Sequence, residues 1–312
     1  MEQPAKGAAM TLKNAYEKGK GQLEESGIAE AEPNAWYLLE HVTGITRALY
    51  LLDSKKELDK VQETCYFELI EKRTRRIPLQ HLTGVQEFMG LEFQVNEHVL
   101  IPRQDTEILV ETALEVLQDI WQSYEEKPSK MNILDMCTGS GCIVLSILKL
   151  FGHPLSGAGV DISGEALETA RKNAKNLGVE AMFLQSDLFE HVEGQYVMMI
   201  SNPPYIRTCE IQALQKEVRD HEPVTALDGG EDGLHFYRKI IEEGRQHLVP
   251  GGYLLFEIGY DQAAEAAKLM WNAGFRSIAV KKDLAGLDRV VSGRYDERVE
   301  SHGLIVDIEA EM

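Results

Sequence analysis

The sequence predicts an α/β fold in which a mostly parallel β-sheet, covered by helices on both faces, follows a smaller bundle of short helices. Two patterns support this prediction. From about residue 103 onward, apolar runs of strand length alternate with helical patterns, as in proteins with parallel sheets. Before residue 76, apolar residues recur only at helical spacing. With 312 residues, of which 44% are hydrophobic, the chain is long enough for two such parts.

The first part of the chain predicts a helical bundle over residues 1–83. Its helical pattern is interrupted at Gly27, Pro33 and Gly44, where we expect helices to end. Between residues 84 and 102 the apolar positions alternate instead, with a break at Gly90. This change predicts a β-hairpin connector.

The third part, residues 103–312, predicts the domain that contains the sheet. Its strand-like runs are 131–136, 157–161, 181–185, 196–201, 252–258 and 278–281. The helical patterns are 106–124, 143–151, 164–177 and 262–273. A glycine-rich segment at 229–233 predicts a long loop, either functional or mobile, before a helix that begins at Leu234.

The charge of the chain is distributed unevenly. The net charge is −19, and residues 86–312 carry 38 acidic side chains against 20 basic ones. Phosphate binding needs clustered Lys and Arg, so this part does not suit a broad nucleic-acid footprint. The one basic cluster is Lys72-Arg73-Thr74-Arg75-Arg76, which we interpret as a solvated helix end.

Compartment and metal content can also be predicted. The four cysteines, Cys65, Cys137, Cys142 and Cys209, show no CxxC spacing, which favours reduced thiols over a zinc site. No apolar run reaches the roughly 18 residues of a membrane span. The segment from Met1 to Met10 lacks the apolar stretch of a secretion signal. We therefore expect a cytoplasmic protein without a membrane partner.

The residues that follow the first strand of the sheet predict an anion or nucleotide site. Glycines at a strand-to-helix turn allow close backbone approach, and the following helix offers free N–H groups. The spacing differs from the dinucleotide fingerprint, so the loop alone does not identify the ligand. The residues expected to contact a cofactor here are Asp135, Cys137, Thr138, Gly139, Ser140 and Gly141.

The next two strands end in carboxylates. Asp161 closes one strand at a position where an acidic side chain can accept hydrogen bonds from both ribose hydroxyls. It could instead cap the following helix, although Ser163 could serve as that cap. The next strand ends at Asp187 and Leu188, which could contact the edge and face of an adenine.

The fourth strand ends in Asn202-Pro203-Pro204-Tyr205, and its prolines must terminate the strand. Four strand ends now point to one crevice that suits an adenosine-like ligand. The arrangement resembles the class I S-adenosylmethionine-dependent methyltransferases, which have a Rossmann-like domain with a mostly parallel seven-stranded sheet. The tetrapeptide resembles the subset that methylates planar nitrogen in glutamine amides or adenine. This resemblance implies S-adenosyl-L-methionine as cofactor, S-adenosyl-L-homocysteine as product and no metal.

The chemistry explains these residue types. A planar nitrogen is a poor nucleophile until both of its N–H bonds are held. The Asn202 oxygen and the Pro203 carbonyl can accept these hydrogens, Pro204 stiffens the corner, and Tyr205 can stack on the planar group. Transfer then needs mainly alignment, without a strong general base. We predict Asn202, Pro203 and Tyr205 as catalytic, the whole tetrapeptide as substrate-binding and Asn202 also as cofactor-binding. The competing interpretation is a rigid turn with a surface tyrosine.

Several further segments resemble one family, the release-factor glutamine methyltransferases (HemK/PrmC). They are 76–84, 88–93, 99–107, 202–205, 222–223, 227–233, 256–259 and 283–290. The resemblance implies methylation of N5 of the glutamine in the Gly-Gly-Gln motif of peptide chain release factors. It also implies that the helical bundle binds this protein substrate. We expect a monomer without a nucleic-acid substrate.

The chain departs from the family at two positions, and other functions fit parts of the pattern. Cys137 stands where the family usually has glycine, and Gln104 where proline is common. A redox role for Cys137 would require a lowered thiol pKa. The alternative functions are adenine-N6 methylation of DNA or RNA, glutamine methylation of a ribosomal protein, and non-catalytic binding of S-adenosylmethionine.

Overall fold

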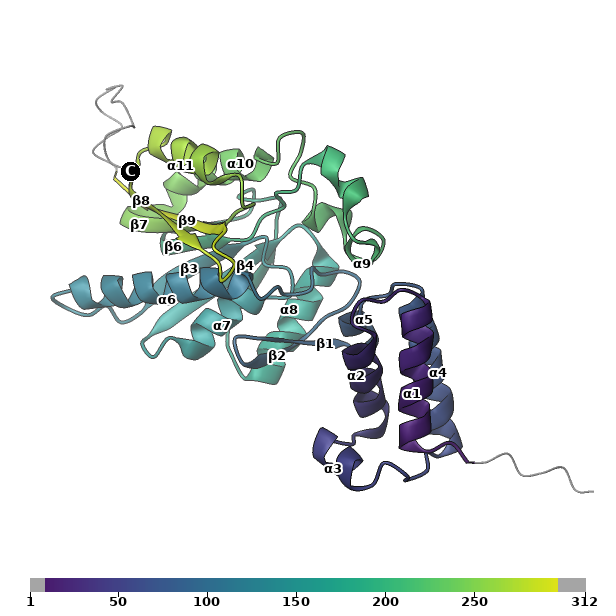
Figure 1. Ribbon diagram of the computed structural model, residues 1–312. Coiled ribbons are helices and arrows are strands. Elements are labelled where there is room, and N and C mark those ends of the chain that lie inside the picture. The colour runs from purple at the N-terminus through teal and green to yellow at the C-terminus, as the bar shows by residue number, and fades with distance from the viewer. Residues whose placement is uncertain (1–8, 297–312) are drawn as a thin grey trace, which may run out of the picture. The chain divides into compact units, whose positions relative to one another are not determined.

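A computed structural model describes residues 9–296 of the chain and shows two compact units (Figure 1). Unit 1 comprises Met1–Val85 together with Gln215–His221, and unit 2 comprises Gln86–Leu214 and Glu222–Met312. None of the helices within residues 9–296 has the length and apolar character needed to cross a membrane. Most of the N-terminal segment examined for a secretion signal lies outside the described residues.

Unit 1 contains the predicted helices. They are α1 (Leu12–Glu25), α2 (Ala31–Thr43), α3 (Arg47–Leu52), α4 (Lys60–Thr74) and α5 (Leu79–Thr83), with the short α9 (Lys216–Arg219). Local sequence stabilises the first turn of α4, where the Asp59 carboxylate accepts a hydrogen bond from the Gln62 N–H (2.8 Å) in a reciprocal capping box. Buried residues such as Leu23, Leu39 and Tyr66 form the core between the helices.

The helix break predicted at Pro33 is wrong. Helix α2 begins at Ala31 and runs through Pro33. A proline is tolerated there because the N–H groups of the first helical turn have no intrahelical acceptor. The breaks at Gly27 and Gly44 do occur, and both glycines adopt a left-handed conformation.

The basic cluster lies at the end of α4, as predicted, but only Lys72 and Arg75 are fully exposed to solvent. Arg73 is buried, and its guanidinium donates to Asn34 Oδ1 (2.7 Å) and to Glu217 Oε1 (3.1 Å). Arg76 donates to the same Glu217 oxygen (3.3 Å) and to the carbonyl of Gly27 (2.9 Å). The cluster therefore ties α9 to the helices of unit 1, and two of its cations are occupied within the protein.

Replacing Arg73 by methionine should destabilise unit 1. The change removes one of the two cations that pair with the Glu217 carboxylate. Because Arg76 still pairs with it, we expect the free energy of unfolding to fall by only about 2–3 kcal/mol. Urea denaturation followed by circular dichroism measures this. The matched control is Arg75→Met, whose exposed pair with Glu71 should contribute under about 0.5 kcal/mol. Equal effects of the two substitutions would contradict the assignment.

The same pair predicts a pH dependence. Burial alone would raise the pKa of Glu217, but hydrogen bonds, including those from Arg73 and Arg76, outweigh it and hold the pKa below its usual value. Such a carboxylate stabilises the fold above its ordinary pKa, and this contribution is lost as the pH falls through the lowered value. The difference between wild type and Arg73→Met should therefore shrink in acid.

Unit 2 contains a seven-stranded sheet, as the fold class predicted. The hairpin of β1 (Val85–Phe88) and β2 (Leu91–Gln94) precedes it. The strands of the sheet are β3 (Met131–Met136), β4 (Leu155–Asp161), β5 (Met182–Gln185), β6 (Tyr196–Ser201), β7 (Leu248–Glu257), β8 (Phe275–Lys282) and β9 (Asp288–Tyr295). Their order is β5-β4-β3-β6-β7-β9-β8, and only the pairings of β9 with β7 and β8 are antiparallel.

Helices cover both faces of this sheet (Figure 1). On one face α6 (Thr106–Ser123), α7 (Cys142–Leu150) and α8 (Gly164–Leu177) pack against residues such as Ile133 and Met198. On the other, α10 (His235–Gly244) and α11 (Ala263–Asn272) pack against Leu134 and Met199. Adjacent strand residues thus enter different cores, which explains the continuous apolar runs of the parallel strands. The short 3₁₀ helices are η1 (Thr208–Ala213), η2 (Val224–Ala226) and η3 (Arg245–His247).

Candidate active site

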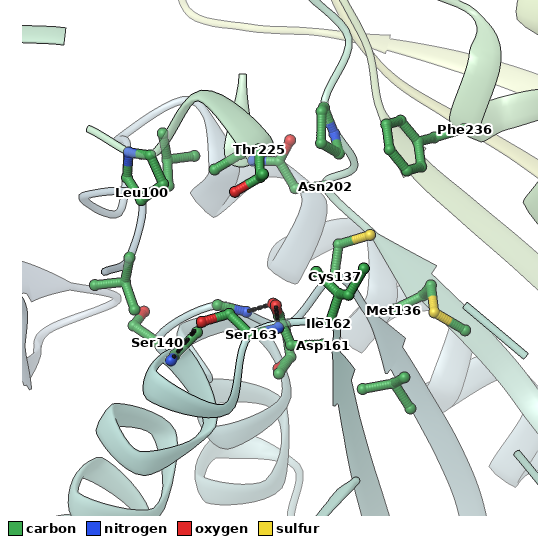
Figure 2. Close-up of a pocket in the computed structure, with 18 of the residues that line it drawn as sticks. Leu100, Met136, Cys137, Ser140, Asp161, Ile162, Ser163, Asn202, Thr225 and Phe236 are labelled. Carbon is green, nitrogen blue, oxygen red and sulfur yellow. Dashed lines mark hydrogen bonds between the residues drawn. The ribbon is translucent and has the colours of Figure 1, made fainter. Parts of the chain in front are cut away.

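A cavity of about 560 Å³ opens at the carboxyl ends of the parallel strands, where ligands bind in sheets of this class. Figure 2 shows Asn202 and Thr225 across this cavity from Cys137 and Asp161. The predicted site residues that line it are Cys137, Thr138, Gly139, Ser140, Asp161, Asp187, Leu188, Asn202 and Pro204. Residues from four strand ends therefore meet at one cavity.

Asp135 supports the glycine-rich loop at 137–141 through hydrogen bonds and does not line the cavity. Its side chain is fully buried, and Oδ2 accepts from the Thr138 hydroxyl (2.6 Å) and the Val144 N–H (3.3 Å). Burial raises the pKa of Asp135 to about 7. The expected contact between Asp135 and a cofactor is therefore replaced by a role in shaping the loop. Gly141, which precedes α7 in a left-handed conformation, likewise shapes the turn without lining the cavity.

Asp161 joins the loop to the next strand. Its Oδ2 accepts from the Gly139 N–H (2.8 Å) and its Oδ1 from the Ser163 N–H (2.9 Å). The competing interpretation of Asp161 as the helix cap is wrong, because the Ser163 hydroxyl accepts from the Ala166 N–H and caps α8. Each carboxylate oxygen has a further lone pair for a ligand.

Cys137 occupies a strained position. Its φ is +62°, in the left-handed region that favours glycine, the residue expected there from the family resemblance. Burial, together with the charges of Asp161 and Asp135, raises the pKa of the Cys137 thiol well above its ordinary value. A redox sensor needs the opposite shift, so the structure argues against that role.

The Asn202–Tyr205 corner contributes Asn202 and Pro204 to the lining of the cavity. Asn202 lines it and donates from Nδ2 to the Thr106 hydroxyl oxygen (3.3 Å), which leaves Oδ1 for a ligand. Pro203 is buried, and neither it nor Tyr205 lines the cavity. The Tyr205 hydroxyl donates to Glu257 Oε1 (3.2 Å), so Tyr205 is anchored inward and is not a surface tyrosine.

The glycine-rich segment at 229–233 packs against this corner through Gly229 and Gly233. The Gly229 N–H donates to the Ile206 carbonyl (2.8 Å), and the Gln262 amide donates to the Tyr205 carbonyl (3.0 Å). A Cβ at Gly229 would lie 2.6 Å from the Tyr205 Cα and 2.8 Å from the Pro204 carbonyl oxygen. Only glycine allows this contact between the two backbones.

Sequence reasoning did not single out the remaining lining residues. They include His98, Leu100, Arg103, Thr106, Pro223, Thr225, Phe236 and Lys239. Arg103 also donates to the buried Glu222 (2.5 Å). Most of them lie outside the strand ends, from which the site residues were predicted. The segments 99–107 and 222–223, which carry the family resemblance, were the available signal.

Comparison with known proteins identifies the relatives of this chain. Residues 14–84 match the family model described as the PrmC N-terminal domain, and residues 113–220 match the methyltransferase small domain. The release factor glutamine methyltransferase of Geobacter sulfurreducens is 37% identical, covering 91% of this chain and 96% of that protein. The enzyme of that name from Thermodesulfovibrio yellowstonii is 40% identical, covering 80% and 88%.

Among solved structures, the catalytic domain of hMettl16, in complex with the MAT2A 3′UTR hairpin 6, matches the fold. Its TM-score is 0.52, its identity is 15%, and the match covers 77% of this chain and 84% of that one. This likeness concerns the fold alone. The sequence identity over nearly the whole length of the relatives shows that the chain belongs to the release factor glutamine methyltransferase family.

Proposed function

We propose that this protein transfers a methyl group from S-adenosylmethionine to N5 of the glutamine in the Gly-Gly-Gln motif of peptide chain release factors. The observation that carries the proposal is Asn202, whose Oδ1 is left for a ligand on the wall of the cavity while Nδ2 is bound to Thr106. An oxygen at this place can accept an N–H from a glutamine side chain.

The cavity fits S-adenosylmethionine. A Cβ on Gly139 would meet no heavy atom within 4 Å, so the loop backbone is open to a ligand. Asp161 offers lone pairs to a ribose, and Asp187 and Leu188 line the cavity where an adenine is expected. When bound, S-adenosylmethionine supplies a methyl group activated by a sulfonium.

Asp161→Ala should weaken binding of S-adenosylmethionine by about 10- to 100-fold, the range expected for one or two hydrogen bonds to a charged group. The variant loses the ribose acceptor and frees the Gly139 N–H. Titration calorimetry measures the change. Asp161→Asn retains one oxygen and should be intermediate. Unchanged affinity in Asp161→Ala would mean that Asp161 only supports the loop.

The chain holds the acceptor amide by hydrogen bonds. Asn202 Oδ1 accepts one of the two N–H groups, which favours a pyramidal nitrogen with an available lone pair. The Pro203 carbonyl, the second acceptor proposed from the sequence, would require the bound glutamine to reach past the residues that line the cavity, because Pro203 is not among them. Tyr205 is anchored through Glu257 and stiffens the corner. No strong base is needed, because the nitrogen loses its proton after the methyl group has been transferred.

Unit 1 is proposed to bind the release factor. Helix α3 buries none of its side chains, and Leu51 and Leu52 are 75% and 83% exposed. Exposed apolar surface of this kind marks a contact site. Replacing both leucines by aspartate should raise KM for an intact release factor about tenfold and leave the rate on a short Gly-Gly-Gln peptide unchanged. Leu150→Asp, at an exposed position of unit 2, is the matched control.

Methylation of adenine is the second candidate. The hMettl16 likeness shows only the fold, and in unit 1 Arg73 and Arg76 are occupied by Glu217. The acidic balance of residues 86–312 also favours a protein substrate. Glutamine methylation of a ribosomal protein would use the same corner. We propose a cytoplasmic location, because release factors act at ribosomes. We also propose that the enzyme is a monomer.

The deciding experiment incubates the protein with S-adenosylmethionine and, separately, a release factor, a ribosomal protein fraction, DNA and RNA. Mass spectrometry then locates any added methyl group. A methyl group on the Gly-Gly-Gln glutamine, absent from a Gly-Gly-Glu variant, supports the proposal. Methylation of adenine alone, or binding without transfer, overturns it.

A further inference from the structure

A rigid turn between β8 and β9 exposes an apolar side chain. Leu284 is 92% exposed, so it contributes almost nothing to the core of unit 2. The turn around it is nevertheless held by several hydrogen bonds. The Asp283 carboxylate accepts from the N–H groups of Ala285 (2.9 Å) and Leu287 (3.0 Å), and the Asp283 N–H donates to the Leu287 carbonyl (2.8 Å). The turn therefore presents the leucine at a fixed place.

A buried ion pair anchors this turn to the rest of the site. Arg289 donates from Nε and Nη2 to Asp283 Oδ2 (3.2 and 2.9 Å), and both residues are buried. The same guanidinium lies 3.4 Å from Asp105 Oδ2. Asp105 directly precedes Thr106, whose hydroxyl oxygen accepts from Asn202. The turn is thus connected to the helix end that contacts the predicted catalytic asparagine.

The turn lies at the edge of the sheet where the cavity opens. Strand β9 is antiparallel to β7, and Val290, near its start, pairs with Glu257 at the end of β7. The β8–β9 turn therefore lies beside the carboxyl end of β7, and ligands bind at the carboxyl ends of such strands. The loop after β7 carries Tyr260, which is 64% exposed. This loop is joined to β9, because the Ile258 N–H donates to the Arg289 carbonyl (2.9 Å).

Tyr260, Leu284 and Leu287 form what we call the rim surface, and all three side chains are exposed. A single exposed apolar residue is common and needs no explanation. These three lie on two joined loops, at the same edge of the sheet as the cavity. Ile162 and Val224, which are also exposed, line the cavity itself. Apolar side chains grouped in this way mark a contact surface for a ligand that extends out of the cavity.

We propose that the rim surface binds apolar side chains of the methylated polypeptide, within a few residues of the acceptor glutamine. This inference rests on the proposed function. A polypeptide that places one glutamine in the cavity must run across its rim, with about 3.3–3.6 Å between successive residues. In Gly-Gly-Gln the two residues before the glutamine have no side chain. Side-chain contacts that select this substrate must therefore come from positions farther along the polypeptide.

The place and rigidity of the rim surface suit those positions. None of its three residues lines the cavity, so they remain available when the cavity is filled. The Asp283 hydrogen bonds and the ion pair with Arg289 fix the turn before the substrate arrives. A turn that is already ordered loses less conformational entropy on binding than a flexible loop does.

The first test compares two peptide substrates. Leu284→Asp combined with Leu287→Asp should raise KM about tenfold for a peptide of about 20 residues centred on the glutamine, the loss expected for an apolar anchor of an interface. KM for a short Gly-Gly-Gln peptide should stay within about threefold of wild type, because that peptide does not reach the rim surface. Leu284→Met keeps an apolar side chain and should stay within about threefold on both peptides.

Met182→Asp is the matched control. Met182 is 68% exposed and is the first residue of β5, so it lies at the opposite edge of the sheet. Its replacement should leave KM for the 20-residue peptide within about threefold of wild type. The melting temperatures of all these variants should match that of the wild type, because the replaced side chains are exposed. The same rise of KM in Met182→Asp would reveal a general effect of charge and overturn the inference.

A second measurement identifies the occupant directly. The photoreactive residue p-benzoylphenylalanine replaces Leu284, and the protein is irradiated with a release factor and S-adenosylhomocysteine. Mass spectrometry should locate the cross-link within about ten residues of the glutamine, a limit set by the length of an extended chain. The same photoreactive residue in place of Met182 should give no cross-link to that segment.

The outcomes separate this inference from the proposed function. If the enzyme methylates the glutamine but the cross-link falls elsewhere on the release factor or on a second copy of the enzyme, the rim surface is assigned wrongly and the proposed function stands. An unchanged KM of the double variant for the 20-residue peptide has the same meaning. If no release factor is methylated, the proposed function fails, and this inference fails with it.

Discussion

Gly229→Ala is expected to reduce kcat by about 10²-fold or more, although the residue does not touch the cavity. The added Cβ would lie 2.6 Å from the Tyr205 Cα and 2.8 Å from the Pro204 carbonyl oxygen. Both neighbours belong to the backbone of the corner, so the strain cannot be relieved by a side-chain rotation. A displacement of the corner by about 1 Å is enough for a rate loss of this size.

The effect should be confined to the corner. Gly152→Ala is the matched control, because a Cβ there would have no heavy atom within 4 Å. Single-turnover kinetics should show wild-type rates for this control, and both variants should bind S-adenosylmethionine within about threefold of wild type, since Gly229 contacts neither Asp161 nor Gly139. A Gly229→Ala enzyme with a normal rate would show that the 229–233 segment can move away from the corner.

Asn202→Ala is expected to reduce kcat by about 10²–10³-fold, the usual cost of removing one preorganised group that stabilises a transition state. The side chain supplies the Oδ1 acceptor on the cavity wall, and its loss leaves one substrate N–H unheld. KM for the release factor should change less than kcat, because this interaction strengthens as the nitrogen becomes pyramidal.

A control separates this effect from damage to the fold. Thr208→Ala removes the hydroxyl that donates to Asp228 (2.7 Å) a few residues beyond the corner, at an exposed position, and should leave kcat nearly unchanged. An Asn202→Ala enzyme within threefold of wild type would remove Asn202 from the mechanism.

The sequence predicted the central parallel strands best, because β3 and β6 are mostly apolar and their residues enter two different cores. The strands at 131–136 and 196–201 occur with the predicted bounds. The sequence did not reveal β9, because Arg289, Ser292 and Arg294 interrupt the apolar pattern of this mostly buried strand. Its polar residues are accommodated by contacts such as that of Arg289 with Asp283 (2.9 Å).

The site was predictable where function depends on the end of a strand. Asn202, Asp161 and Gly139 were found in this way, and all three line the cavity. Thr106 and Glu257 could not be derived from spacing, because their roles come from contacts with residues 96 and 52 positions away in the chain. The family resemblance marked their segments without indicating what the side chains do.

The segment Gln215–His221 belongs to unit 1, although it lies within the sequence of unit 2. This affects how the protein can be divided experimentally. The chain passes between the units at Val85, at Leu214 and again at His221, so no single cut separates them. A fragment that begins at residue 86 would carry Glu217 without Arg73 and Arg76, the cations that neutralise it. Chimeras between relatives should therefore exchange both segments of unit 1 together, because swapping the N-terminal helices alone would combine α9 from one parent with arginines from the other.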